Sequence, residues 1–231
     1  MQGDPLLMHR PGEYIGTAAD GVQPVDDGPA RFCTFPNLMP AGYTAEIIGH
    51  GVREVIMDPA VGNFQNGSHA EISDTEHDWM LTDLRDAMRA RFDEAAKACG
   101  YDDAPPADEM EFELWLSVRG EGGVFHWHTD RDPKPVQTRW LSLCYYMHTH
   151  PMRFMGGELE FYDGQQVLPA DNLLACFDSR QTHRVRHVHA VPFGTCTKEN
   201  SVWPDPPALA WPDARWSVTG WAHSLHVPPP E

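Results

Sequence analysis

The chain has 231 residues, enough for one domain with a sizeable core, and its 41% hydrophobic content is ordinary for a globular protein. Its formal charge is −17, from 34 acidic and 17 basic residues, and a surface of this sign repels polyphosphates. We therefore expect no nucleic acid and no membrane among its partners. A small molecule, an amino acid or a peptide is compatible with this charge.

The cysteines favour a reducing compartment. They are odd in number, widely spaced and include no CxxC pair. They are Cys33, Cys99, Cys144, Cys176 and Cys196. The first residues, MQGDP, lack the basic and apolar regions of a signal peptide, and no apolar run reaches the roughly 18 residues that span a bilayer. We expect a cytoplasmic protein.

The N-terminal part, residues 1–109, is predicted to be an arm followed by supporting helices. Residues 1–30 are rich in Gly, Pro and Asp and have no sustained period. A short strand is expected over Arg31–Phe35 and a helix within Ala41–Val55. The clearest helix is Asp78–Cys99, where apolar residues recur at steps of three to five and Gly100 occupies the C-cap position.

The remainder of the chain, from residue 110 to 225, is predicted to be mainly β. Apolar and polar residues alternate over Met110–Val118, which is typical of a half-buried strand. Further strands are expected over Thr138–Met147, Gly157–Tyr162, Leu173–Phe177, Arg184–Ala190 and Trp216–His223. We expect a single α+β domain over 1–231, with a jelly-roll (double-stranded β-helix) core and an inserted loop at about 193–212.

Two segments can supply metal ligands. His128-Thr129-Asp130 offers an imidazole and a carboxylate, which project to the same side of an extended segment. His183 would add a second imidazole from another strand. Two histidines and one carboxylate on one face of a metal form the facial triad of non-haem iron oxygenases, which leaves the other face open.

Other histidines compete for these positions. His126 is an alternative to His128, although a pair formed by these two histidines would lack the carboxylate. His187 and His189 are alternatives to His183. The Phe-Asp-Ser segment before His183 and the valine after it favour His183 over both.

Five further motifs follow the HxD segment in a fixed order. They are CYYMH at 144–148, GGELEF at 156–161, LLACFDS at 173–179, HRV at 183–185 and RWSVTGW at 215–221. With these motifs, residues from about 111 to 223 resemble the prolyl-4-hydroxylase-like branch of the Fe(II)/2-oxoglutarate dioxygenases. The resemblance is specific to the superfamily and does not specify a substrate.

The resemblance implies roles for six residues. His128, Asp130 and His183 would bind Fe(II). Arg215 would pair with the distal carboxylate of 2-oxoglutarate, a bidentate contact that suits a guanidinium. Ser217 and Tyr146 would add hydroxyl groups to the same carboxylate.

The chain departs from the family pattern at three places. Arg215 follows His183 by 32 positions, whereas relatives place this arginine much closer to the histidine. Val118 stands where some relatives have a tyrosine before the first ligand, and Tyr146-Met147-His148 replaces a Tyr-Leu-Asn segment.

The implied reaction is hydroxylation of an unactivated C–H bond, coupled to decarboxylation of 2-oxoglutarate to succinate and CO₂ with O₂ as oxidant. Because Asp130 is present, hydroxylation is favoured over halogenation, whose enzymes have a small residue there. Two other readings stay open, a cupin-like metal-binding jelly roll and a non-catalytic sensor on the same fold. Near the motifs, four side chains could hold a substrate carboxylate: Arg131, Arg153, Arg180 and His126.

Overall fold

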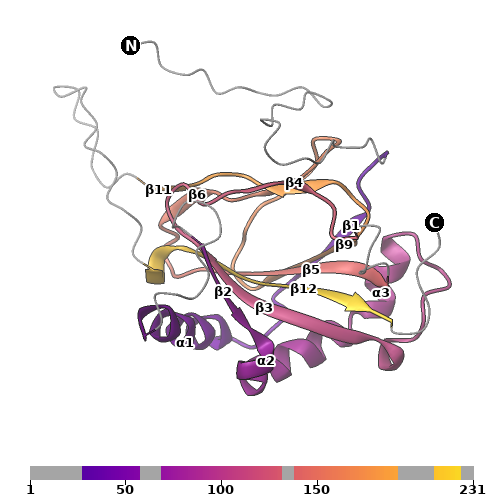
Figure 1. Cartoon of the computed structure of the whole chain (residues 1–231), viewed down its shortest axis with the longest axis horizontal. Helices are drawn as coiled ribbons and strands as arrows, with labels where there is room; N and C mark the ends of the chain where they lie inside the picture. The colour runs from indigo at the N-terminus through magenta and orange to yellow at the C-terminus, as the bar shows by residue number, and fades with distance from the viewer. Residues whose placement is uncertain (1–27, 58–68, 132–137, 192–210, 225–231) are drawn as a thin grey trace, which may run out of the picture.

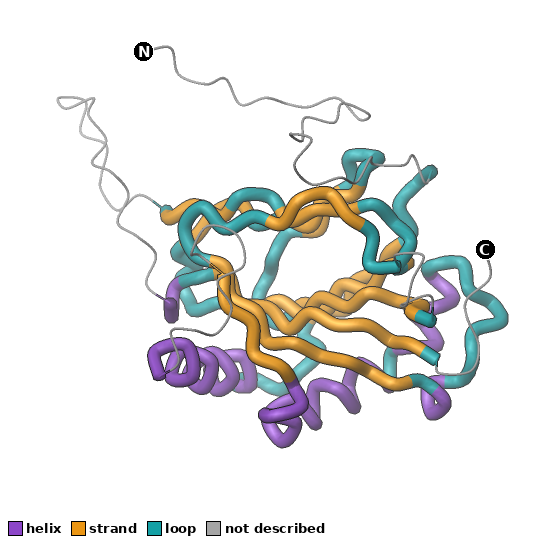
Figure 2. The backbone as a smooth tube through the Cα atoms, viewed as in Figure 1, coloured by secondary structure: helices purple, strands orange, loops and turns teal. Residues whose placement is uncertain are grey.

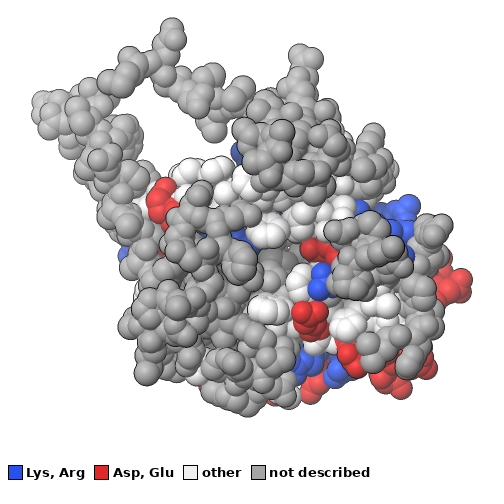
Figure 3. Space-filling view, in the orientation of Figure 1, with Lys and Arg blue, Asp and Glu red and all other residues white. Residues whose placement is uncertain are grey.

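A computed structural model describes residues 28–57, 69–131, 138–191 and 211–224 of the chain. Its architecture is two facing β-sheets with helices on the outer side of one of them (Figure 1). In the described part of the chain, no helix is both long and apolar enough to cross a bilayer. On the face shown in Figure 3, the acidic and basic side chains of the described residues are interspersed.

The larger sheet has six strands in the order β1-β9-β5-β12-β3-β2. Their bounds are β1 Phe32–Pro36, β2 His69–Ser73, β3 Glu111–Arg119, β5 Arg139–Met147, β9 Leu173–Asp178 and β12 Arg215–His223. All neighbouring pairs are antiparallel. β12 lies between β3 and β5, so the C-terminal strand is central to the sheet.

The smaller sheet has four strands in the order β4-β10-β7-β8, and a separate pair joins β11 to β6. Their bounds are β4 Phe125–His128, β6 Phe154–Gly156, β7 Leu159–Phe161, β8 Gln166–Val167, β10 His183–Val185 and β11 Val188–Ala190. Apolar side chains from both sheets meet in the space between them, among them Tyr146, Phe161 and Phe177. This arrangement confirms the expected jelly roll.

Three helices lie along one side of the molecule, against the outer face of the larger sheet (Figure 2). They are α1 (Tyr43–Met57), α2 (Asp74–Arg89) and α3 (Phe92–Ala98), and two short 3₁₀ turns cover Ala107–Glu109 and Trp211–Asp213. Apolar residues of the helices, such as Ile47, Leu84 and Phe92, join Leu114 and Leu116 of β3 in the main core. The alternation in β3 therefore buries its apolar side under the helices.

The predicted helix Asp78–Cys99 is wrong as a continuous element. It is interrupted between α2 and α3, where the Arg91 N–H donates to the Met88 carbonyl, only three residues back, at 3.0 Å. Gly100 does end α3 as expected: its φ is +86°, and its N–H donates to Lys97 at 3.0 Å.

Most predicted strands are confirmed with shifts of one or two residues. The segment Arg184–Ala190 is an exception, because β10 and β11 pair with different partners, β7 and β6. The strands β2, β4, β6 and β8 were not expected. The domain boundaries stay a prediction, and the insertion expected at 193–212 falls mostly outside the described residues.

Candidate metal centre and co-substrate pocket

The structure brings the three predicted metal ligands together. His128, at the end of β4, is the direct cross-strand partner of His183, at the start of β10. Asp130 follows two residues after β4. Nε2 of His128 lies 3.3 Å from Oδ1 of Asp130, and Nε2 of His183 lies 3.7 Å from Oδ2. Among the described residues, this is the only group of three or more such ligands within 4.8 Å of one another.

Both histidines are oriented by the same kind of hydrogen bond. Nδ1 of His128 lies 2.8 Å from the carbonyl of His126, and Nδ1 of His183 lies 2.9 Å from the carbonyl of Gln181. A carbonyl only accepts, so each Nδ1 carries the proton and donates it. In the neutral imidazole, each Nε2 then presents a lone pair towards Asp130, the tautomer that a metal ligand requires.

Asp130 is not held by a strand, which corrects the expectation that it extends the strand of His128. β4 ends at His128, and the backbone N–H of Asp130 donates to the Ser179 carbonyl at 3.1 Å. On the other side, Arg139 donates to the Asp130 carbonyl at 3.1 Å. The carboxylate is thus positioned by two distant segments of the chain.

The protonation states suit metal binding. Burial raises the pKa of Asp130, but the adjacent His183 and His128 outweigh it, and the pKa stays below its ordinary value. Burial, with a smaller contribution from the neighbouring His128, lowers the pKa of His183 to about 4. At neutral pH, Asp130 is a carboxylate and His183 is a neutral imidazole, so no proton has to leave before a metal binds.

These donors fit a divalent transition metal. With Nδ1 donating, Nε2 of His128 and Oδ1 of Asp130 are two acceptors that face each other at 3.3 Å. Such a contact is repulsive unless a metal ion lies between the two atoms or Nε2 carries a proton. Ligands about 2.1 Å from a metal, at right angles, would stand about 3 Å apart, close to the distances found here. Two imidazoles and one carboxylate are the donor set of non-haem iron.

The alternative histidines lie outside this group. His187 and His189 stack on each other with ring centroids 6.0 Å apart, and Nδ1 of His189 lies 3.3 Å from Glu121. The side chain of His126 is exposed, and its backbone carbonyl serves His128. The preference for His128 and His183 on sequence grounds therefore agrees with the geometry.

Arg215 and Tyr146 extend from the larger sheet into the same interior. Arg215, the first residue of β12, is 1% exposed, and Tyr146 on β5 is fully buried. The Arg215 guanidinium lies 5.0 Å from the centre of the Tyr146 ring. Ser217, the cross-strand partner of Tyr146, accepts a hydrogen bond from Nη1 of Arg215 at 3.2 Å. The three residues thus form one polar cluster.

Two donors in this cluster have no acceptor. Nη2 of Arg215 and the hydroxyl of Tyr146 are buried and make no hydrogen bond within the described residues. Burial raises the pKa of Tyr146 well above its ordinary value, so the hydroxyl keeps its proton. A buried donor without a partner costs about 1 to 3 kcal/mol. A carboxylate placed here would accept from both groups at once.

Gly157 makes room for Arg215. Nε of Arg215 donates to the Gly157 carbonyl at 2.8 Å, and this bond connects β12 of the larger sheet to the loop before β7 of the smaller one. A Cβ at Gly157 would lie 2.5 Å from Cδ of Arg215, and its φ of +71° disfavours other residues. The Gly-Gly pair is therefore more than the hairpin turn that its sequence suggests.

The alternation rule missed a polar, buried end of β3. Val118 packs in the main core, so it does not face the jelly-roll interior. Its neighbours Ser117 and Arg119 are buried on the opposite face, where Nη1 of Arg119 donates to Ser117 at 3.1 Å. Arg119 is the cross-strand partner of Arg215. The only sequence signal was the polar side of an alternating strand, which ordinarily indicates solvent.

Arg180 is engaged in an internal ion pair. Its Nη2 lies 2.8 Å from Oδ2 of Asp178, and its Nε and backbone N–H also donate to this carboxylate. The sequence had suggested that Arg180 could hold a substrate carboxylate. The structure instead assigns its guanidinium to a carboxylate of the protein itself.

The sequence of the jelly roll matches a known family model. The model of the 2OG-Fe(II) oxygenase superfamily matches residues 114–223, which run from β3 to the end of β12 and contain all six site residues described above. The jelly-roll part of the chain, residues 114–223, is therefore similar to the 2OG-Fe(II) oxygenase superfamily. Oxygenases of this superfamily use Fe(II), 2-oxoglutarate and O₂.

The curated relative that matches is distant in sequence. An uncharacterised PKHD-type hydroxylase of Synechocystis sp. is 26% identical over 129 residues, a match that covers 50% of this chain and 37% of that relative. The chain thus spans well under half the length of this curated relative.

Solved structures agree with the fold. A Pseudomonas putida prolyl-4-hydroxylase has a TM-score of 0.55 at 16% identity, with 86% of this chain and 95% of that chain covered. The α-ketoglutarate-dependent epimerase SnoN from nogalamycin biosynthesis has a TM-score of 0.56 at 12% identity, with 84% of this chain and 78% of that chain covered.

Proposed function

We propose that this protein is a Fe(II)- and 2-oxoglutarate-dependent dioxygenase of that superfamily, and that it hydroxylates an unactivated C–H bond. In the proposed reaction, one oxygen atom of O₂ enters the substrate and the other enters succinate, as 2-oxoglutarate loses CO₂. Iron supplies the oxidising chemistry when it is bound with 2-oxoglutarate and O₂. His128, Asp130 and His183 would hold the iron.

The observation that carries the proposal is the pair of unpartnered buried donors, Nη2 of Arg215 and the hydroxyl of Tyr146. We propose that they bind the distal carboxylate of 2-oxoglutarate, together with the hydroxyl of Ser217. A metal-binding jelly roll of the cupin kind would have no need of an unsatisfied guanidinium. A non-catalytic sensor would need neither a complete ligand set nor this cluster.

The remaining residues exclude water and fix the ligands. Phe177 packs on the ring of His183 with centroids 4.6 Å apart, and Phe125 packs on His128 at 4.3 Å. The His128 side chain is 24% exposed, whereas that of His183 is 5% exposed. We infer that substrate and O₂ approach from the His128 side, because the His128 side chain is the more exposed of the two.

The substrate class proposed is a small molecule, an amino acid or a peptide. The two solved structures named above are a prolyl-4-hydroxylase and an epimerase from nogalamycin biosynthesis, so enzymes with different reactions share this fold. The acidic composition, with a formal charge of −17, makes nucleic acid an unfavourable partner.

Anaerobic titration of the metal-free protein with Fe(II) and then 2-oxoglutarate tests the proposal. A visible charge-transfer band is expected when both are bound. Asp130→Ala should abolish the band by removing a ligand, and it should also abolish succinate formation. Arg215→Ala should still bind Fe(II) but require far more 2-oxoglutarate. Bound metal without any band in the wild type would favour the cupin-like reading instead.

A further inference from the structure

One turn, Asp178–Thr182, holds two ligand-bearing segments at once. Its Ser179 carbonyl accepts hydrogen bonds from the backbone N–H groups of Asp130 and Arg131, at 3.1 and 3.0 Å. Its Gln181 carbonyl accepts the Nδ1–H of His183 at 2.9 Å. The position of the carboxylate and the orientation of the imidazole therefore depend on the shape of the same short segment.

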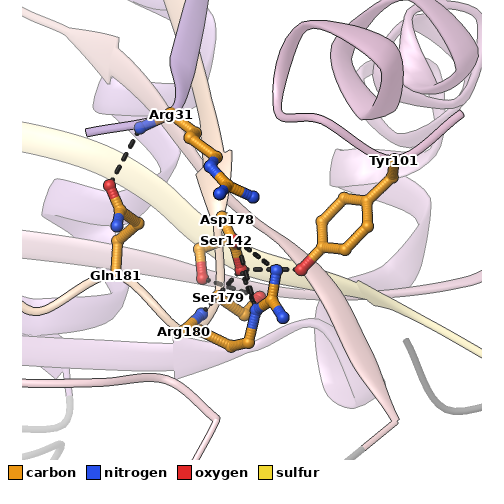
Figure 4. Close-up of polar contacts among 7 residues, drawn as sticks. All are labelled: Arg31, Tyr101, Ser142, Asp178, Ser179, Arg180 and Gln181. Carbon is orange, nitrogen blue, oxygen red and sulfur yellow. Dashed lines mark hydrogen bonds and ion pairs between the residues drawn. The ribbon is translucent and has the colours of Figure 1, made fainter. Parts of the chain in front are cut away.

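A buried carboxylate fixes this shape. Asp178 is 3% exposed and accepts the backbone N–H of Arg180 at 3.0 Å, and its own carbonyl accepts the N–H of Gln181 at 2.9 Å. The Arg180 side chain folds back on the same carboxylate, with Nη2 at 2.8 Å from Oδ2. Ser179 is tied to the sheet through its hydroxyl, 3.1 Å from that of Ser142 on β5 (Figure 4).

The last support comes from outside the jelly roll. The hydroxyl of Tyr101, just after α3, donates to Oδ1 of Asp178 at 2.7 Å (Figure 4). The Tyr101 ring is 4% exposed and packs edge-on against Trp140, with centroids 5.1 Å apart. The backbone N–H of Arg31, just before β1, donates to the Gln181 side chain at 2.8 Å. Tyr101 and Arg31 both precede residues 114–223, which the family model covers.

We propose that Tyr101 is a positioning residue for the metal centre, acting through Asp178 and the turn Asp178–Thr182. The hydroxyl restrains Asp178, Asp178 restrains the turn, and the turn aims the Ser179 and Gln181 carbonyls at Asp130 and His183. The N-terminal helical part of the chain thus contributes to the order of the metal ligands as well as to the core. This inference rests on the proposed function for the identity of the metal.

Tyr101→Phe tests the proposal because it removes one hydroxyl and keeps the ring. Tyr145→Phe is the matched control: its hydroxyl also donates to a side chain of the fold, Asn172, at 2.9 Å, and this bond leads to none of the ligands. Each variant should lose a similar, small amount of stability to urea. Only Tyr101→Phe should weaken Fe(II) binding, by about 10-fold, the lower end of the effect of losing an outer-shell partner.

A second readout needs no metal. In the metal-free protein, the Nδ1–H signal of His183 in NMR spectra should shift in Tyr101→Phe and stay in place in Tyr145→Phe. Asp178→Asn should have a larger effect than Tyr101→Phe on both readouts, because it removes the charge that holds Arg180. If Asp178→Asn does not fold, the results for Tyr101→Phe still test the proposal by themselves.

Two results would overturn the inference. One is an unchanged Fe(II) dissociation constant and an unchanged His183 signal in Tyr101→Phe. The other is an equal weakening of Fe(II) binding in Tyr145→Phe at the same loss of stability, which would mean a general structural effect. Absence of Fe(II) binding by the wild type would instead contradict the proposed function, so the two failures are distinguishable.

Discussion

Replacing Gly157 by alanine should weaken the binding of 2-oxoglutarate while leaving the affinity for Fe(II) nearly unchanged. The added Cβ would lie 2.5 Å from Cδ and 3.0 Å from Nε of Arg215, whereas ordinary contacts begin at 3.4 Å. Arg215 would have to retreat by up to about 1 Å to restore ordinary carbon–carbon contact. This displacement breaks or lengthens its 2.8 Å bond to the Gly157 carbonyl and changes the position of the guanidinium.

The size of the effect follows from these contacts. A hydrogen bond to a charged group contributes about 1.5 to 3 kcal/mol, so a misplaced guanidinium should weaken 2-oxoglutarate binding by about 10- to 150-fold. The alanine also adopts a φ of +71°, and a left-handed backbone costs about 1 to 2 kcal/mol of folding stability. Fe(II) affinity should change little, because the three ligands keep their own hydrogen bonds.

The assay is anaerobic titration with 2-oxoglutarate at saturating Fe(II), combined with urea unfolding of the metal-free protein. Gly42→Ala is the control, since Gly42 has a φ of +93° and nothing within 4 Å of the added Cβ. It should lose similar stability and keep its affinity for 2-oxoglutarate. Wild-type affinity in Gly157→Ala, together with the expected loss of stability, would refute the assignment of Arg215 to the co-substrate.

Two further outcomes are expected. Tyr146→Phe removes a buried hydroxyl that has no partner among the described residues. The metal-free variant should therefore be as stable as the wild type or about 1 kcal/mol more stable, and it should bind 2-oxoglutarate about 10-fold more weakly. A clear loss of stability in urea would show that the hydroxyl already has a hydrogen-bond partner in the wild type. The pKa of His183 is lowered to about 4 in the folded protein, against about 6.5 in the unfolded chain. Between these two pH values the unfolded state binds more protons than the folded state. The free energy of unfolding of the metal-free protein should therefore fall as the pH is lowered from 7.5 to 5. His183→Ala should lose this part of the pH dependence in urea titrations at several pH values, and a profile identical to that of the wild type would contradict the assignment.

Local patterns in the sequence were sufficient to propose the metal ligands and to predict much of the sheet. Ligand chemistry belongs to side-chain types, so His128, Asp130 and His183 could be proposed from their spacing and motif context. Strand alternation and a glycine cap are equally local, and β3, β5, β12 and the end of α3 at Gly100 agree with prediction. These features depend on neighbours within a few residues along the chain.

Other features depended on contacts between distant segments. The alternation of β3 predicted a solvent-facing side at Ser117 and Arg119, but the smaller sheet closes over that side, and both residues are buried. Asp130 occupies its place because the Ser179 carbonyl, remote in sequence, accepts its N–H. The link from Tyr101 to Asp178 joins residues 77 positions apart.

The sequence by itself therefore determined which groups could bind a metal and a dicarboxylate, because that chemistry resides in single side chains. Only the tertiary structure decided which donors stay buried without acceptors, such as Nη2 of Arg215, and which carbonyls orient the ligands. Whether a residue is buried, and which hydrogen-bond partners it has, depends on the segments that pack against it. Pairing between strands distant in sequence determines which segments these are.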